Sequence, residues 1–471
     1  MKVLISGANG YIGRRLKRRM LEDESVSVRL MVRNRKSIST NGSERVEIVE
    51  ADTFDPASLE RAMEGVDVAY YLIHSMASGD DYREKDRKSA ENFRVAAIAA
   101  GVKQIIYLGG LGVKESASEH LLSRIETGEI LSAKPEAIEC LWFRAGIIIG
   151  SGSASFEIIR NLVQKLPLMI TPAWVHTRAQ PIGVGDVVRY LYEAKELKGV
   201  GNLVIDIGTD EMSYKEIMQT TADVMGLKRI FISVPFLTPH FSSYWLGIIT
   251  PVPVSIARAL IEGLKSEVVR QNRIADTLFG FRPMPFKEAV AKALEEIEQQ
   301  QVISRWSDSG SWENGKNIAD ALFIDRHEVP LGSTTPQKMF RTLCCIGGES
   351  GWFSYSFLWE LRGFADKLIG GVGLNRGRRC NIDLRVGDSV DFWKVADIEE
   401  NRRVLLVAQM KLPGKAWLEF RIEEGALIQS AYFYPEGILG RLYWYAMMPF
   451  HYFIFADMVR QLVRRAQERG K

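Results

Sequence analysis

Three glycines near the start of the chain have the spacing of a nucleotide-binding turn. They lie in Gly7-Ala-Asn-Gly10-Tyr-Ile-Gly13, directly after a short apolar run and at the start of an amphipathic stretch. In such a turn the first glycine lets the backbone curl, the second lets it approach a pyrophosphate, and the third permits close helix–strand packing. The N–H groups at the helix N-terminus then attract phosphate. We therefore expect a dinucleotide site, with a ligand-free turn as the alternative; its residues here are Gly7, Asn9, Gly10, Tyr11, Ile12 and Gly13.

Two further residues bear on which dinucleotide binds. Arg33 follows the second expected strand, where an acidic residue suits the ribose of NAD and a basic residue suits the 2′-phosphate of NADP. We therefore expect NADP(H) in preference to NAD(H), with a solvated basic turn as the alternative. Asp52 follows the third strand and can accept a hydrogen bond from the adenine amino group. It can equally cap the helix expected at Pro56–Ala62 or the turn before it.

A parallel sheet is needed to bring these residues together. In the first 150 residues, short β-branched runs alternate with amphipathic stretches, which predicts a doubly wound, Rossmann-type α/β sheet. The expected strands are Lys2–Ser6, Ser27–Val32, Val46–Glu50, Val68–Ile73, Gln104–Leu108 and Ile138–Phe143. The expected helices between them are Ile12–Leu21, Pro56–Ala62 and Arg83–Ala100.

The composition changes near residue 310, where Gln299–Asn317 is polar and rich in Ser, Gly and Asn. We expect a Rossmann domain over residues 1–300, with substrate-side segments in 151–300, then a linker over 301–318. Residues 319–471 are expected to form a separate α+β domain with an antiparallel sheet and a long C-terminal helix from about Pro449 to Arg469. Its expected strands are Val390–Ala396, Val404–Met410, Ala416–Ile422 and Leu427–Tyr434.

The first 300 residues resemble the short-chain dehydrogenase/reductase superfamily, in its atypical NmrA-like and nucleotide-sugar-epimerase-like branches. The resemblance rests on the glycine turn, Asp52, the segment Asn92–Gly101 leading into Ile105–Gly110, Arg144-Ala-Gly146-Ile-Ile-Ile-Gly150 and Gln180-Pro-Ile-Gly-Val-Gly-Asp186-Val. It implies a fold that binds NAD(P) at the carboxyl edge of the sheet.

The superfamily's usual catalysts are missing. A Tyr and a Lys four residues later normally share a helix face, with a Ser or Thr after the fifth strand. Here that strand ends in Leu108-Gly109-Gly110, and the helix reads His120-Leu-Leu-Ser-Arg124. His120 and Arg124 have the spacing to share a face, and His can exchange a proton near neutral pH. We therefore hypothesise that they act in catalysis; a surface or capping His is the alternative.

His74 and Ser75 follow the fourth expected strand, at the sheet edge that faces the cofactor in such folds. We expect them to line the nicotinamide side of the site. The alternative is that Tyr70 and Tyr71 pack in the sheet and Ser75 begins a turn.

Residues 320–471 resemble an uncharacterised bacterial domain found fused to such reductases and, more distantly, a START-type helix-grip fold. The residues that carry this include Gly351-Trp-Phe, Leu358-Trp-Glu-Leu-Arg362-Gly, Gly370–Arg378, Asp391-Phe-Trp393 and Met410–Gly414. Its many aromatic residues are interpreted either as a pocket or clamp for an apolar ligand or as an ordinary core. The basic loop with Arg376, Arg378 and Arg379 either contacts an anion or is solvated.

The overall composition excludes several classes. With 61 Lys+Arg against 58 Asp+Glu, the chain lacks the basic excess expected for nucleic-acid binding. Four irregularly spaced cysteines favour a reducing cytoplasm and predict neither a disulfide framework nor a Cys-rich zinc site. Because no H-x-x-x-H motif or carboxylate cluster has metal-ligand spacing, we expect no metal site. Ile230–Ala257 is interrupted by prolines, and Leu442–Ala456 has only 15 residues, so neither is expected to span a membrane. Contact with a membrane surface and the oligomeric state stay open.

Two functions fit these observations. The first is a cytoplasmic NADP(H)-dependent oxidoreductase whose C-terminal domain binds or covers an apolar carbonyl or alkene substrate. The second is a non-catalytic NADP(H)-binding redox sensor, scaffold or assembly protein, suggested by the missing Ser/Tyr/Lys set.

Overall fold

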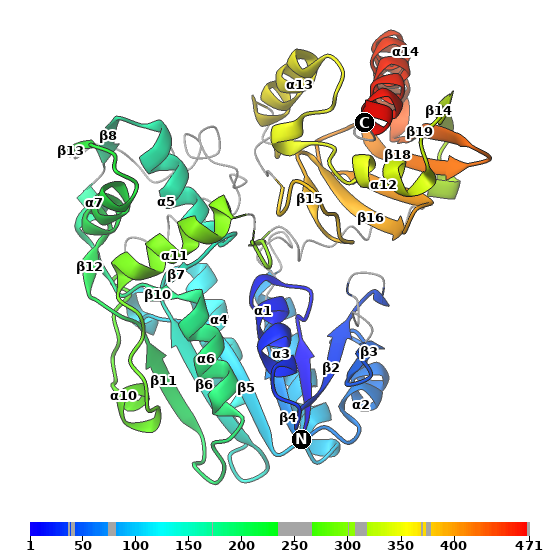
Figure 1. Ribbon diagram of the computed structural model, residues 1–471. Helices are drawn as coiled ribbons and strands as arrows, with labels where there is room; N and C mark the ends of the chain where they lie inside the picture. The colour runs from blue at the N-terminus through cyan, green and yellow to red at the C-terminus, as the bar shows by residue number, and fades with distance from the viewer. Residues whose placement is uncertain are drawn as a thin grey trace. The chain divides into compact units, whose positions relative to one another are not determined.

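The chain divides into two compact units in a computed structural model, each described by itself below (Figure 1). The N-terminal unit is Met1–Thr250 with Val254–Ser309, and the C-terminal unit includes Gly310–Lys471. The structure describes residues 1–35, 38, 43–73, 82–171, 173–233, 266–299, 301–306, 318–368, 371–373 and 378–468.

The N-terminal unit is built on a seven-stranded sheet in the order β11-β6-β5-β4-β1-β2-β3. All its neighbouring strands run parallel, which confirms the predicted Rossmann-type sheet (Figure 1). The strands are β1 (Lys2–Ser6), β2 (Ser27–Val32), β3 (Val46–Glu50), β4 (Val68–Tyr71), β5 (Gln104–Gly110), β6 (Glu139–Ala145) and β11 (Leu203–Ile207).

Helices cover both faces of this sheet because its strands bury side chains on both sides. In β1, Val3 and Ile5 join one core, and Leu4 joins the core on the opposite face. The first face carries α1 (Tyr11–Leu21), α6 (Val184–Ala194) and α10 (Ile274–Leu278), and the second carries α2 (Pro56–Met63), α3 (Tyr82–Ala99) and α4 (Glu119–Leu131).

A smaller layer is formed by segments that follow β6. Its core joins α5 (Ala154–Lys165), α7 (Tyr214–Val224) and α11 (Phe286–Glu298). Three two-stranded sheets accompany them: β7 (Ile148–Ile149) with β10 (Ile182–Gly183), β9 (Arg178–Ala179) with β12 (Met212–Ser213), and β8 (Leu168–Thr171) with β13 (Ile230–Ser233). After α11, Val302 and Ser304 are buried, so the first residues of the expected linker pack as part of this unit.

The C-terminal unit contains a six-stranded antiparallel sheet in the order β14-β19-β18-β17-β16-β15 (Figure 1). The strands are β14 (Phe323–Pro330), β15 (Ser389–Val390), β16 (Trp393–Glu399), β17 (Arg403–Ala408), β18 (Gly414–Glu423) and β19 (Ala426–Pro435), and the helices are α12 (Pro336–Leu343), α13 (Ser356–Leu368) and α14 (Gly437–Glu468). The helices contribute to one core against the sheet, which includes Trp352, Trp359, Phe392 and Phe455. The predicted α+β unit with a long terminal helix is confirmed; the helix-grip assignment stays a prediction.

Two predicted boundaries in this unit were wrong. The helix expected from Pro449 begins at Gly437, so Pro449 lies inside α14. Proline lacks the N–H that would bond to the carbonyl of Tyr445, yet packing of the preceding turns on β14 and β19 maintains the helix. The strand expected over Val390–Ala396 is instead a hairpin of β15 and β16 that turns at Asp391, whose φ is 55°.

No helix within the described ranges combines the length and the apolar character needed to cross a membrane.

Candidate functional site

The glycine turn lies where the strand order of the N-terminal sheet reverses. β1 pairs with β2 on one side and with β4 on the other, and the chain leaves β1 directly into the turn. In open parallel sheets, ligands bind beyond the carboxyl ends of the strands at such a reversal. The strand order therefore places the expected ligand-binding crevice at the glycine turn, where the dinucleotide site was predicted.

Two of the glycines occupy places that no side chain can share. Gly7 has φ 66°, and a Cβ there would lie 2.6 Å from the carbonyl oxygen of Leu72, just after β4. A Cβ on Gly13 would lie 2.3 Å from the carbonyl oxygen of Gly7. The Gly10 N–H donates to the Gly7 carbonyl oxygen at 2.9 Å, which closes the turn. The backbone thus forms a smooth cradle of the kind that a pyrophosphate requires.

The first turn of α1 suits an anion. Gly10 caps the helix without a side-chain hydrogen bond, and no acidic residue lies in the first turn. The N–H groups of Tyr11, Ile12 and Gly13 therefore lie at the positive end of the helix dipole. The Arg14 side chain lies beside the turn and donates from Nε to the Asn9 carbonyl oxygen at 2.9 Å.

Residues distant in sequence hold this turn in place. The Ser304 hydroxyl donates to the Tyr11 carbonyl oxygen at 2.7 Å. The phenol oxygen of Tyr11 is buried, which raises its pKa, and the Arg15 guanidinium lies over the Tyr11 ring. Arg15 also donates to the Ser151 carbonyl oxygen at 2.8 Å. Sequence reasoning missed this support, because Ser304 lies in the stretch interpreted as a linker.

Arg33 and Asp52 lie at the ends of neighbouring strands. Arg33 directly follows β2 and is exposed, as a contact to a 2′-phosphate requires. Asp52 follows β3, and its Oδ1 accepts a hydrogen bond from the Phe54 N–H at 2.9 Å, which is the turn that we gave as an alternative role. Asp55 is the residue that caps α2. The adenine contact of Asp52 stays a prediction.

The pair expected after β4 cannot be placed: His74 and Ser75 lie outside the described residues, as does Arg376. The two tyrosines before them pack in the sheet. Tyr70 is buried and donates to the Leu191 carbonyl oxygen at 2.8 Å, and Tyr71 lies 2.8 Å from the Ser89 hydroxyl.

His120 and Arg124 both lie on α4, one turn apart. Burial, together with the charge of Arg124, lowers the pKa of His120 to about 3, so the imidazole is neutral at pH 7. The end of β5 carries no hydroxyl, and a Cβ on Gly110 would lie 2.7 Å from Leu121 Cδ1, so any side chain there would require Leu121 to move. The catalytic roles of His120 and Arg124 stay predictions.

A buried ion pair that sequence reasoning missed braces the same edge of the sheet. Arg144 on β6 donates to Asp206 on β11 through Nε at 2.6 Å and Nη2 at 3.0 Å. Asp206 is fully buried and also accepts the Gln271 N–H at 2.6 Å. Arg144 reaches the Gly112 carbonyl oxygen, in the loop after β5, at 3.4 Å. Asp206 stands 62 residues from Arg144, so no local pattern marks the pair.

The arginines of the expected basic loop in the C-terminal unit have structural partners. Arg379 is buried and donates to Asp388 at 3.1 Å, and Arg378 is buried and donates to the Cys344 carbonyl oxygen at 2.6 Å. These contacts fix the two side chains inside their own unit.

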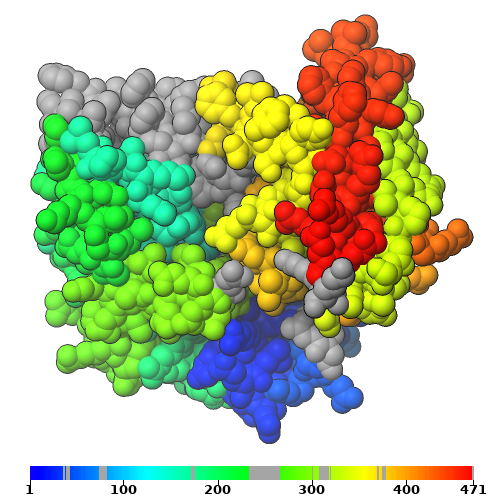
Figure 2. All heavy atoms as spheres, turned by 45° about the horizontal axis from the view of Figure 1, so that its top comes forward, coloured from blue at the N-terminus to red at the C-terminus, as the bar shows by residue number. Residues whose placement is uncertain are grey.

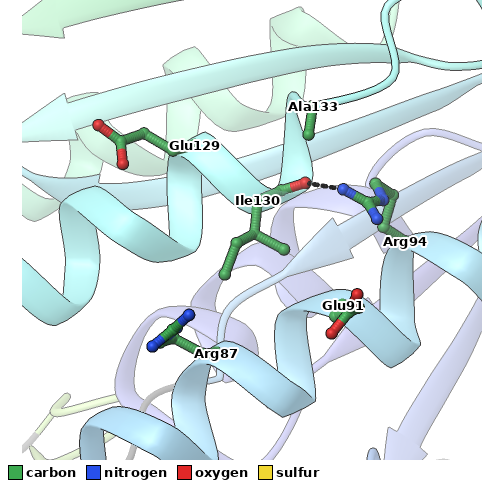
Figure 3. Close-up of a pocket in the computed structure, with 6 residues that line it drawn as sticks. All are labelled: Arg87, Glu91, Arg94, Glu129, Ile130 and Ala133. Atoms are coloured by element: carbon green, nitrogen blue, oxygen red, sulfur yellow. Dashed lines mark hydrogen bonds between the residues drawn. The ribbon is translucent and has the colours of Figure 1, made fainter.

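A hollow between α3 and α4 carries no recognisable chemistry. Figure 3 shows Arg94 donating to the Ile130 carbonyl oxygen there, at 2.7 Å. The lining residues are Arg87, Glu91, Arg94, Glu129, Ile130 and Ala133. Charged surface side chains of both signs dominate it, so the glycine turn remains the candidate site. Among the described residues, no cluster of three or more His, Cys, Asp or Glu is placed to hold a metal ion.

Two family models match this chain. Residues 7–141 match a family described as NAD(P)H-binding, and residues 317–458 match a family described as a protein of unknown function, DUF2867. The first match agrees with the NAD(P)-binding, Rossmann-type fold expected of the N-terminal unit, and the second shows that the C-terminal unit matches a family of its own. The matches leave the choice between NADP(H) and NAD(H) as a prediction.

Individual relatives cover parts of the chain. A (4-alkanoyl-5-oxo-2,5-dihydrofuran-3-yl)methyl phosphate reductase of Streptomyces griseus is 30% identical over 122 residues, which is 26% of this chain and 39% of that enzyme. A ceramide reductase of Caulobacter vibrioides is 26% identical over 50% of this chain and 73% of its own length. The Citrobacter sp. triphenylmethane reductase, solved with NADP(H), has a TM-score of 0.52 and 20% identity, covering 62% of this chain and 100% of that chain.

Proposed function

We propose that this protein is an NADP(H)-dependent oxidoreductase that acts on an apolar small molecule with a carbonyl group or an alkene. The cradle formed by Gly7, Gly13 and the open N-terminus of α1 carries the proposal, because it fits a pyrophosphate at the reversal point of the sheet. The NAD(P)H-binding family match and the two relatives named as reductases support it.

The residues at the carboxyl edge of the parallel sheet have different roles in this proposal. The backbone N–H groups of Tyr11, Ile12 and Gly13 bind the pyrophosphate, and Arg33 binds the 2′-phosphate. The bound nicotinamide supplies or accepts the hydride. The pair of Arg144 and Asp206 fixes the loop after β5 and so maintains the shape of the edge. His120 is assigned to proton exchange with the substrate. Its imidazole is kept neutral mainly by burial and further by the Arg124 charge, so it accepts the hydroxyl proton when the hydride passes to NADP⁺ and returns it in the reverse direction.

The test combines binding with turnover. We expect the full chain to bind NADPH more tightly than NADH by isothermal titration, and to oxidise NADPH when supplied with members of a panel of apolar aldehydes, ketones and quinones. His120→Ala is expected to lower kcat while leaving the affinity for NADPH unchanged. If His120→Ala retains turnover, His120 does not exchange the proton, but the assignment of the protein as an oxidoreductase still holds. Absence of NADPH and NADH binding would contradict the proposal as a whole.

A second candidate is a non-catalytic NADP(H)-binding sensor, scaffold or assembly protein. Two observations favour it: β5 ends without a hydroxyl, and the low pKa of His120 means that no imidazolium is present at neutral pH. Tight NADPH binding without oxidation across the whole panel would select this candidate. The cytoplasmic location and the ligand role of the C-terminal unit remain predictions under either function.

A further inference from the structure

The first half of α14 presents large apolar side chains to solvent. Ile438 is 77% exposed and Tyr452 is 65% exposed, although side chains of this kind are ordinarily buried. The exposed set on this helix is Ile438, Leu439, Leu442, Tyr445, Met448, Phe450, Tyr452 and Phe453. We call these residues the α14 patch. Apolar patches of this size on a protein surface mark an interaction site.

The opposite side of the same turns provides the packing. Trp444 is 5% exposed and stacks on Phe323 and Phe433 of the sheet, and Phe455 is buried in the core. At about 100° per residue, the patch covers about 200° of the helix circumference, whereas a helix that fits a protein groove presents a stripe of about 100°. The patch is therefore broader than one groove can cover.

A second apolar stripe lies on α13. Phe357, Leu361, Phe364 and Leu368 are each more than half exposed, and their spacing places them on one face of the helix. α13 is held beside α14 by a contact between the Trp359 and Phe455 rings. Figure 2 shows both helices, α13 in yellow and α14 in red, on one face of the C-terminal unit.

The one charged residue within the patch segment is positive, which suits a phospholipid surface. Between Glu436 and Asp457, the single charged residue is Arg441, which is exposed. A guanidinium at the edge of an apolar patch can bind a lipid phosphate while its neighbours enter the acyl region. The patch also contains Tyr445 and Tyr452, whose hydroxyl groups suit the boundary between headgroups and acyl chains.

We propose that the α14 patch and the α13 stripe bind the surface of a phospholipid bilayer. A fluid bilayer can contact the whole of a broad helical arc, whereas a rigid protein groove covers only part of it. The Arg441 guanidinium can bind the lipid phosphates. The helices lie on the membrane without crossing it, because no helix in the described part of the chain meets the requirements for a span. The inference is independent of NADP(H) binding.

The test measures flotation of the full chain with vesicles of phosphatidylcholine and phosphatidylglycerol. We expect the parent protein to float with the vesicles, and the double variant Leu442→Ser/Phe453→Ser to bind about tenfold more weakly or worse. The matched control Val95→Ser/Ile382→Ser also removes two exposed apolar side chains, but away from both helices, and is expected to bind like the parent. Circular dichroism and thermal unfolding verify that both double variants fold.

A second readout reports insertion directly. An environment-sensitive fluorophore attached to Phe453→Cys should shift to the blue when vesicles are added, whereas the same label on Ile382→Cys should not. Equal flotation of the two double variants would overturn the proposal. A parent protein that does not bind vesicles would also overturn the proposal, whether it is monomeric or dimeric. If it forms a dimer that Leu442→Ser/Phe453→Ser dissociates, the patch is instead an interface with a second copy of the chain.

Discussion

The glycine turn of the N-terminal unit and the α14 patch of the C-terminal unit present surfaces of contrasting chemistry. At the turn, three glycines leave no side chain at the key positions, and we propose that polar backbone groups bind the ligand. On α14, the backbone is satisfied within the helix, and large apolar side chains face outward. In the two proposals, the turn therefore binds one small, charged group at a fixed place, whereas the patch contacts an apolar medium over a broad area.

The difference extends to how each region tolerates substitution. A methyl group added at Gly13 would clash with backbone atoms of Gly7 and Ala8, so we expect the turn to tolerate no side chain at this position. An exposed side chain of the patch makes few contacts within the protein, so its removal changes binding without changing the fold. The following predictions test this contrast, from the largest expected effect to the smallest.

The two sides of α14 should differ most. Trp444→Ala removes a buried indole that stacks with Phe323 and Phe433 of the sheet, and we expect the free energy of unfolding to fall by about 3–5 kcal/mol. Phe453→Ser, on the exposed side, should change it by less than about 0.5 kcal/mol. Urea unfolding followed by circular dichroism measures both. Similar losses in the two variants would mean that the patch is part of the core.

At the turn, a single methyl group should abolish dinucleotide binding. Gly13→Ala places Cβ 2.3 Å from the Gly7 carbonyl oxygen, and we expect a loss of stability of about 1–3 kcal/mol together with loss of NADPH binding. Gly185→Ala is the control, since a Cβ there meets nothing within 4 Å and the residue lies in the first turn of α6. Calorimetry should find Gly185→Ala unchanged in affinity. Retained NADPH binding in Gly13→Ala would refute the cradle.

The charge at the end of β2 should set the choice of dinucleotide. Arg33→Asp replaces an attractive charge with a repulsive one, so the Kd for NADPH should rise about tenfold or more. The Kd for NADH should change little, and binding titrations with both dinucleotides measure the ratio. If Arg33→Asp changed the Kd for NADPH and the Kd for NADH equally, Arg33 would not contact the 2′-phosphate and would belong to a solvated turn.

Each unit holds a histidine whose pKa is lowered mainly by burial, to about 3 for His120 and about 4 for His451. In the unfolded chain both titrate near 6.5, so below that pH the unfolded state binds more protons. The free energy of unfolding should therefore fall as the pH decreases from about 6.5 towards 4, by at most about 1.4 kcal/mol per pH unit for each histidine.

Single variants separate the two histidines. His120→Gln and His451→Gln should each flatten this pH dependence, as measured by urea unfolding at a series of pH values. A slope that neither variant changes would show that other groups dominate it.

Sequence reasoning succeeded where the signal was local. The strand, turn and helix around Gly7 to Gly13 follow each other directly, and β1, β2 and β3 were predicted with their observed bounds. It failed where distant residues meet. Asp206 is recognisable only once the sheet brings it beside Arg144. β14 was missed because its sequence, FIDRHEVP, has four charged or polar residues in a row and lacks the apolar–polar alternation of a strand, although its burial does alternate.

The C-terminal aromatic residues show a second kind of limit. Composition predicted that they form either a core or a ligand pocket, and the structure divides them: Trp352 and Trp359 are buried, whereas Phe450 and Tyr452 are exposed. The last helix was predicted to begin at about Pro449, so the preceding turns, which carry most of the patch, were missed. Which face of a helix is covered depends on the sheet beneath it, which the sequence of the helix alone does not contain.

The hydrogen bond from Ser304 to the Tyr11 carbonyl oxygen has a practical consequence for dissecting the chain. A cut at residue 300, just after α11 ends, would remove Val302 and Ser304, which are both buried in the N-terminal unit. The truncated fragment would lose the clasp on the first turn of α1, and its weak affinity for dinucleotides would then be mistaken for a need for the C-terminal unit. An independently expressed N-terminal fragment should therefore extend at least through Trp306, whose N–H donates to the Gly152 carbonyl oxygen.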